Sequence, residues 1–232
     1  MSFRRTEINK RRSPLGYITL VVRIALFVVL GGMVLLVISE LEPVANWLGG
    51  AKSSAPLVGI VAGHWQNDPG AVCPDGLQEV EINLEIARRV AELLRQEGYR
   101  VEIMPEYSPK LNGFKGAAFL AIHNDSCIEM SGFKVARMTH ADTPEQEDRL
   151  VLLLIEQYGA ATGLAFHENT ITDDMRQYHA LRQIDPATPG AIIETGFMGG
   201  DRRILTEEPD RVAAGVANGL LAFLRETAPI EQ

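Results

Sequence analysis

Cysteine is scarce in this sequence, and compact metal-binding motifs are missing. The chain has two cysteines, Cys73 and Cys127, with neither a CxxC pair nor the spacing of a zinc finger. Three states are therefore open to them: a disulfide, two free thiols or thiolate ligands of a metal. The HExxH motif of zinc peptidases does not occur either. A catalytic metal site would have to combine residues from distant parts of the chain.

Positive charge is also scarce beyond the N-terminus. The net charge is −8, and residues 1–17 carry +4, which leaves −12 for residues 18–232. A domain this acidic is a poor candidate for binding nucleic-acid phosphates, so we expect no nucleic-acid partner. Internal repeats are absent, and 232 residues of which 46% are apolar suffice for one globular domain with an appendage.

The N-terminal part has the pattern of a membrane anchor. Residues 24–38 are uncharged, and with residues 17–22 they form an apolar stretch that only Arg23 interrupts, about the 20 residues needed to cross a bilayer. Basic residues precede the stretch, which predicts a cytoplasmic N-terminus and an extracytoplasmic domain. A cleaved signal peptide is the alternative. The expected organisation is a basic cytoplasmic segment (1–17), a single transmembrane helix (18–39), a linker (40–56) and a globular domain (57–227).

The globular domain alternates short apolar runs with helical patterns, which predicts an α/β fold with a twisted, mostly parallel sheet. The candidate strands are residues 57–62, 100–104, 117–123, 132–138, 178–184 and 191–195. The candidate helices are residues 79–97, 144–158 and 210–225.

Three apolar strands each deliver an ionisable residue at the carboxyl end. His64 follows the first strand, His123 ends the third, and Glu194 lies at the end of the last. In a parallel sheet these ends share one edge, where ligands bind, so the three side chains could converge. A single histidine in such a place is most often a hydrogen-bonded residue near the surface, but a coincidence at three strand ends is harder to accept.

The first predicted helix adds a carboxylate to this edge. At 100° per residue, Glu79 falls within the apolar arc of the helix, whereas Glu81 falls among the charged residues. A buried carboxylate needs a partner or a metal. The alternative is that Glu79 is an ordinary first-turn residue that interacts with the helix dipole.

Two histidines and one carboxylate are typical of a catalytic zinc site that keeps one coordination position open. Zinc in such a site lowers the pKa of water and provides a nucleophile near neutral pH. We therefore predict that His64, Glu79 and His123 bind Zn²⁺. Glu194 is the candidate proton acceptor, with a fourth metal ligand or a backbone-capping residue as alternatives.

Six short motifs follow one another along the domain: Gly63-His64, Asp68-Pro69-Gly70-Ala71, Gly76-Leu77-x-Glu79, Asn83-Leu84, Ile122-His123 and Glu194-x-Gly196-Phe197. Together they resemble the zinc-dependent N-acetylmuramoyl-L-alanine amidases, over about residues 57–225. The resemblance implies a zinc amidase domain with helices on both faces of the sheet. It also implies a peptidoglycan hydrolase that cleaves between N-acetylmuramic acid and L-alanine, with His64, Glu79 and His123 as zinc ligands and Glu194 as the catalytic residue.

The sequence departs from this family at the rim of the predicted site. Asn124-Asp125 and Gly199-Gly200 stand where the family often has Ala-Asn and Ser-Asn, and residues 105–116 look shorter than the family's arginine-containing stretch. These altered loops motivate one competing interpretation, an inactive wall-binding or regulatory module. The other is a zinc peptidase that cuts another wall-peptide amide.

The cysteines flank the predicted ligands. Cys73 lies between His64 and Glu79, and Cys127 lies four residues after His123. If both histidines bind one metal, the cysteines are close together, and in an oxidising compartment a disulfide is favoured over two thiols or thiolate ligands. Among the other histidines, His179 is the candidate for a substrate contact.

Overall fold

The computed structural model describes residues 23, 26–27 and 55–227. The predicted basic segment, membrane helix and linker lie almost wholly outside these residues. Among the residues that are described, no helix has the length and apolar character needed to cross a membrane. Residues 55–227 belong to one compact unit.

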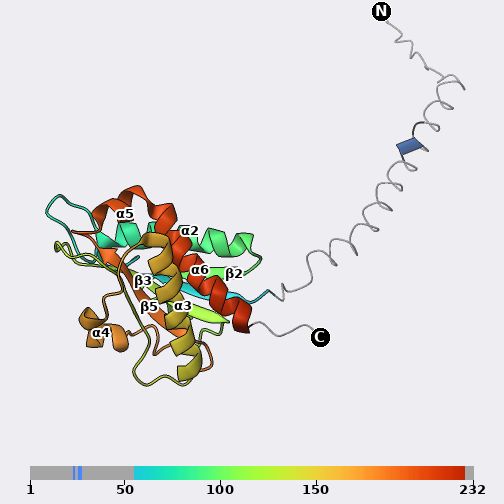
Figure 1. Ribbon diagram of the computed structural model, residues 1–232. Coiled ribbons are helices and arrows are strands. Elements are labelled where there is room, and N and C mark those ends of the chain that lie inside the picture. Colours follow the sequence, from blue (N-terminus) through green and yellow to red (C-terminus); the bar gives the residue numbers. More distant parts are fainter. Residues whose placement is uncertain (1–22, 24–25, 28–54, 228–232) are drawn as a thin grey trace, which may run out of the picture. The chain divides into compact units, whose positions relative to one another are not determined.

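The domain is built on a five-stranded sheet in the order β2-β1-β3-β5-β4. Figure 1 labels three of these strands, β2, β3 and β5. Its strands are β1 (Leu57–Ala62), β2 (Arg100–Met104), β3 (Ala118–Asp125), β4 (Lys134–Ala136) and β5 (Gly190–Phe197). The neighbours β2-β1, β1-β3 and β3-β5 pair in parallel, and β4 pairs with β5 antiparallel. The prediction of a mostly parallel α/β sheet is confirmed.

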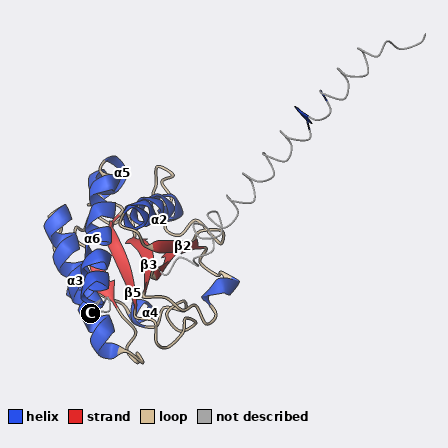
Figure 2. Cartoon of the chain, turned by 90° about the vertical axis from the view of Figure 1, so that its right-hand side faces the viewer, coloured by secondary structure: helices blue, strands red, loops and turns tan. Residues whose placement is uncertain are grey.

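The long helices pack on one face of this sheet. They are α2 (Glu79–Gln96), α3 (Pro144–Thr162) and α6 (Pro209–Thr227), and α5 (Arg202–Glu207) precedes α6. Their apolar side chains share one buried core with alternate residues of β1, including Val58 and Ile60. Figure 2 shows α3 and α6 side by side against the sheet.

The opposite face has a different cover from the one that the resemblance implied. A second core around Phe119 and Val61 is closed by the 3₁₀ turn η1 (Pro109–Leu111), the four-residue helix α4 (Asp173–Arg176) and residues 178–184. The remaining 3₁₀ turn is η2 (Glu168–Thr170). The resemblance implied helices on both faces of the sheet. The structure has long helices on one face only, and the other face carries one short helix and one 3₁₀ turn.

Residues 178–184 form successive turns, so the predicted strand is wrong. The backbone amides of Arg182 and Gln183 donate to the carbonyls of His179 and Ala180, three residues back, as in turns. Tyr178, Ala180, Leu181 and Ile184 are buried in the second core. Apolar side chains at irregular spacing in a packed turn imitate the pattern of a short strand.

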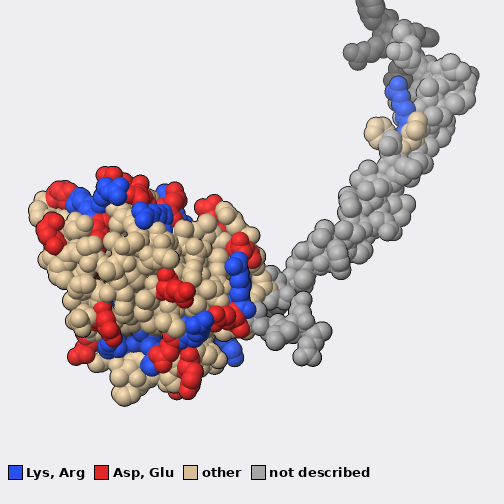
Figure 3. Space-filling view, in the orientation of Figure 1, with Lys and Arg blue, Asp and Glu red and all other residues tan. Residues whose placement is uncertain are grey.

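Charged side chains of both signs are mixed on the outer surface of the helical layer. Figure 3 shows Lys and Arg beside Asp and Glu around the margin of one face, whose centre is largely uncharged. Arg149 of α3 pairs with Glu226 of α6 at 2.6 Å, and both side chains are partly exposed. Exposed pairs of this kind contribute at most about 1 kcal/mol, so core packing holds the helices together.

Candidate metal centre

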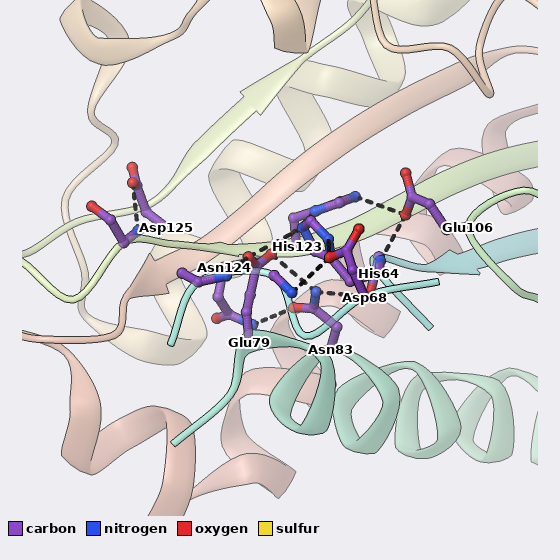
Figure 4. A network of polar contacts seen from close by, with 12 residues as sticks. His64, Asp68, Glu79, Asn83, Glu106, His123, Asn124 and Asp125 are labelled. Carbon is purple, nitrogen blue, oxygen red and sulfur yellow. Dashed lines mark hydrogen bonds and ion pairs between the residues drawn. The ribbon is translucent and has the colours of Figure 1, made fainter. Parts of the chain in front are cut away.

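His64, Glu79 and His123 come together at the carboxyl edge of the sheet (Figure 4). Each offers one ligand atom, and these atoms all lie within 4.8 Å of one another. Glu79 lies between the histidines: its Oε2 is 3.2 Å from His64 Nε2, and its Oε1 is 3.2 Å from His123 Nδ1. The turn after β1, the first residue of α2 and the end of β3 thus supply a group that could hold a metal ion.

Two glycines allow this close approach. A Cβ atom added to Gly63 would lie 2.4 Å from the His123 ring. Gly70 has a φ of 64°, and a Cβ there would lie 2.5 Å from Glu79 Oε2. A side chain at either position would collide with a candidate ligand, His123 or Glu79, so the backbone must pass close to the site without a Cβ.

Glu79 is buried as the helical wheel predicted, whereas Glu81 is exposed. The Glu79 carboxylate accepts hydrogen bonds from the backbone amides of Ala71 (3.0 Å) and Asn124 (3.2 Å) and from Asn83 Nδ2 (3.0 Å). Burial alone would raise the pKa of Glu79, but the contacts with His123 and His64 outweigh it and hold the pKa well below its usual range. Glu79 is therefore an ionised carboxylate.

The remaining nitrogen of each histidine is engaged on the outer side. His64 Nδ1 lies 2.6 Å from Asp68 Oδ1, and His123 Nε2 lies 3.1 Å from the hydroxyl oxygen of Tyr178. Metal-binding histidines commonly donate their second N–H in this way, which fixes the tautomer. His64 Nε2 and His123 Nδ1 are thereby left to face Glu79.

The electrostatics of the group favour positive charge. The hydrogen bond with Glu79 is the largest influence on His64 and, against burial, raises its pKa to about 9. Burial lowers the pKa of His123, but the hydrogen bond with Glu79 and the charges of Glu194 and Glu106 outweigh it, so its pKa is raised. Two imidazoles and one carboxylate that attract positive charge fit a divalent cation.

Glu194 is next to His123 in the β3-β5 register. Its Oε2 is buried and has no hydrogen-bond partner among the described residues. Burial is the largest influence on its pKa and raises it to about 7, with His123 opposing and Glu79 and Asp125 adding to the rise. A carboxyl group with this pKa can accept and return a proton near neutral pH.

Glu106 and Tyr178 were not predicted from the sequence. Glu106 follows β2 and is buried, and its carboxylate accepts from the backbone amide of His64 (2.7 Å) and from the Tyr178 hydroxyl (2.8 Å). Burial would raise the pKa of Glu106, but hydrogen bonding to His179 and the charge of His123 outweigh it and lower the pKa. Residues at the carboxyl ends of parallel strands meet at one edge of the sheet, which is how His64 and His123 were found. The same signal could have found Glu106, because Glu106 follows β2 at that edge.

His179 contacts Glu106 and lies outside the group formed by His64, Glu79 and His123. Its Nε2 lies 2.7 Å from Glu106 Oε1, and its ring stacks on Tyr107 with 4.4 Å between the centroids. Its suggested contact with a substrate stays a prediction.

Cys73 and Cys127 form a disulfide with 5.5 Å between their Cα atoms. The bond joins the loop between His64 and Glu79 to the segment after β3. The state favoured from the sequence is confirmed.

Comparison with known proteins decides the family. Residues 58–222, well over half of the chain, match the family model of the N-acetylmuramoyl-L-alanine amidases (Amidase_3). The chain belongs to this amidase family. The family predicted from the motifs is confirmed, and the group His64, Glu79 and His123 is the candidate metal site of an amidase domain.

Individual relatives agree with this amidase assignment. The chain is similar to the amidase AmiC of Neisseria meningitidis serogroup B, with 40% identity over 52 residues. This match covers 22% of the chain and only 12% of that protein.

Solved amidase structures share the fold. The amidase of Clostridium difficile 630 has a TM-score of 0.61 at 20% identity, over 76% of this chain and 100% of that chain. Ami1 of Mycobacterium smegmatis has a TM-score of 0.62 at 17% identity, over 75% of this chain and 99% of that chain.

Proposed function

We propose that this amidase hydrolyses the peptidoglycan amide bond between N-acetylmuramic acid and L-alanine with the help of Zn²⁺. The observation that carries the proposal is the convergence of His64, Glu79 and His123 beside Glu194, whose Oε2 is buried, in a chain of the amidase family. Three protein ligands with a fourth position left for water or substrate are typical of catalytic zinc sites.

Zinc is the proposed ion because of the donor set. Imidazole nitrogens and one carboxylate suit zinc, whereas Mg²⁺ and Ca²⁺ prefer oxygen ligands only. Bound there, zinc supplies a Lewis acid that polarises the scissile carbonyl and lowers the pKa of water. His64 Nε2, His123 Nδ1 and the Glu79 carboxylate would hold it.

Glu194 is the proposed proton carrier. Its Oε2 has no hydrogen-bond partner among the described residues, so it can take up a proton without breaking an existing hydrogen bond. In the proposed reaction Glu194 accepts the proton of the attacking water and passes it to the nitrogen of the departing L-alanine. The amine leaves as the amide bond breaks, and the carboxylate returns to its starting state.

We also propose that residues 18–39 anchor the enzyme in the cell membrane, with residues 1–17 in the cytoplasm and the catalytic domain outside. The support is the apolar stretch of residues 17–38, which only Arg23 interrupts, and the five Lys and Arg residues that precede it within residues 1–17. Protease added to intact spheroplasts should digest the catalytic domain and spare an N-terminal tag. Protection of the domain would contradict this topology.

The variant Glu194→Ala tests the proposed chemistry. It should retain one zinc per chain and lose hydrolysis of purified cell wall by roughly 10²- to 10⁴-fold, the usual contribution of a general acid-base residue. Glu81→Ala is the matched control, because Glu81 is an exposed carboxylate near the metal-site end of α2 and should keep both properties. Normal wall digestion by Glu194→Ala would show that the assigned role is wrong.

A further inference from the structure

A buried carboxylate links the outer sides of both histidines of the candidate metal site. Glu106 lies on the other side of His64 and His123 from Glu79 (Figure 4). It is 5% exposed. One of its oxygens accepts from the backbone amide of His64, and the other accepts from the hydroxyl of Tyr178 and contacts His179 Nε2. Two of these three partners connect Glu106 to the candidate metal ligands: the amide belongs to His64 itself, and Tyr178 contacts His123.

The first link fixes the backbone of His64. This residue has a φ of 64°, in the left-handed region that residues other than glycine seldom adopt. Such a conformation persists where surrounding interactions hold it. The 2.7 Å hydrogen bond from the His64 amide to Glu106 Oε2 holds the backbone, and Asp68 at Nδ1 holds the ring. Together they direct Nε2 towards Glu79.

The second link fixes the tautomer of His123. The Tyr178 hydroxyl donates its only hydrogen to Glu106 Oε1 at 2.8 Å. Its oxygen can therefore only accept from His123 Nε2, which lies 3.1 Å away. A hydrogen on Nε2 leaves the lone pair of Nδ1 free, on the side that faces Glu79. Tyr178 itself is held in place, since its side chain is buried in the second core.

We infer that Glu106 and Tyr178 are positioning residues that preorganise both histidines for metal binding. This inference rests on the proposed function and extends it to residues that lie behind the metal site. Neither side chain needs to touch the substrate: Glu106 acts through the backbone of His64, and both act through the ring of His123. The segment that supplies Glu106, residues 105–116, is one where the sequence departs from the family pattern.

Metal affinity tests the inference independently of catalysis. Zinc dissociation constants of wild type, Glu106→Gln and Tyr178→Phe should be measured by competition with a chromophoric chelator. Removal of such outer partners typically weakens metal binding by about 10- to 100-fold. We expect losses in this range for both variants. The double variant should lose less than the product of the two single effects, because both act on His123 through one chain of hydrogen bonds.

Tyr158→Phe is the matched control. The Tyr158 hydroxyl is also buried and donates a hydrogen bond, to the carbonyl of Thr195 at 2.5 Å, but it contacts neither histidine. This variant should lose a comparable hydrogen bond and keep the zinc affinity of wild type. The visible spectrum of the Co²⁺-loaded protein should change in Tyr178→Phe and stay unchanged in Tyr158→Phe, since it reports the geometry of the ligands.

The outcomes separate the two proposals. Wild-type zinc affinity and an unchanged Co²⁺ spectrum in Tyr178→Phe and Glu106→Gln would overturn this inference and leave the proposed function standing. A wild-type protein that binds no zinc would overturn both. Should Glu106→Gln fail to fold, Tyr178→Phe decides alone, because it removes one oxygen and keeps the buried ring.

Discussion

The disulfide between Cys73 and Cys127 allows a quantitative prediction about stability. The bond spans 54 residues, and closing a loop of that length stabilises the folded state by about 4 kcal/mol on the chain-entropy relation. For a domain of this size, that corresponds to a fall in melting temperature of roughly 8–16 °C when the bond is reduced. The free energy of unfolding should be measured by urea denaturation of the catalytic domain, with and without a reductant.

The variant Cys73→Ala/Cys127→Ala separates the cross-link from the packing of the sulfur atoms. It should unfold like reduced wild type, to within about 1 kcal/mol for the lost buried atoms. Because the bond joins the loop between His64 and Glu79 to the segment after His123, reduction should also weaken zinc binding. A difference below about 1 kcal/mol between oxidised and reduced wild type would refute the reasoning, since it would mean that the bond does not restrict the unfolded chain.

Three further variants test the packing and charge of the domain. Gly63→Ala should weaken zinc binding at least about tenfold in the chelator competition, because its Cβ would lie 2.4 Å from the His123 ring; unchanged affinity would contradict the close approach. Glu79→Gln should bind no zinc in equilibrium dialysis, because the amide loses the charge that both histidines face, and retention of one equivalent would refute its place among the ligands. Burial raises the pKa of Glu147 from 4.5 to about 7, so the folded state binds this proton more tightly than the unfolded chain does. The resulting stabilisation is complete below the unfolded pKa of 4.5 and is lost as the pH rises through 7. Glu147→Gln should therefore raise the free energy of unfolding by roughly 1–3 kcal/mol at pH 8 and very little at pH 4, and an equal effect at both pH values would count against this.

The periodicity of apolar residues in the sequence was sufficient to predict where several elements begin and which side chains are buried. Strand β1 and helix α2 begin where the patterns placed them, and the wheel distinguished buried Glu79 from exposed Glu81. Parallel strands bring their carboxyl ends to one edge, so the meeting of His64 and His123 could also be predicted.

The second face of the sheet could not be predicted in the same way. Residues 178–184 have no regular hydrogen-bonding period, and their apolar side chains match a strand as well as a packed turn. The misassignment hid the role of Tyr178, whose hydroxyl reaches Glu106 only because the turn packs under the site. A residue that acts through tertiary contacts across 72 positions leaves no local pattern in the sequence.

The products of cell-wall digestion test the proposed function most directly. Zinc-loaded protein should be incubated with purified peptidoglycan, and the soluble products should be analysed by mass spectrometry. We predict stem peptides with a free L-alanine N-terminus together with glycan strands that carry intact, unsubstituted N-acetylmuramic acid. New amino termini at any other residue of the stem peptide, with L-alanine still attached to muramic acid, would contradict the amidase function and indicate a peptidase.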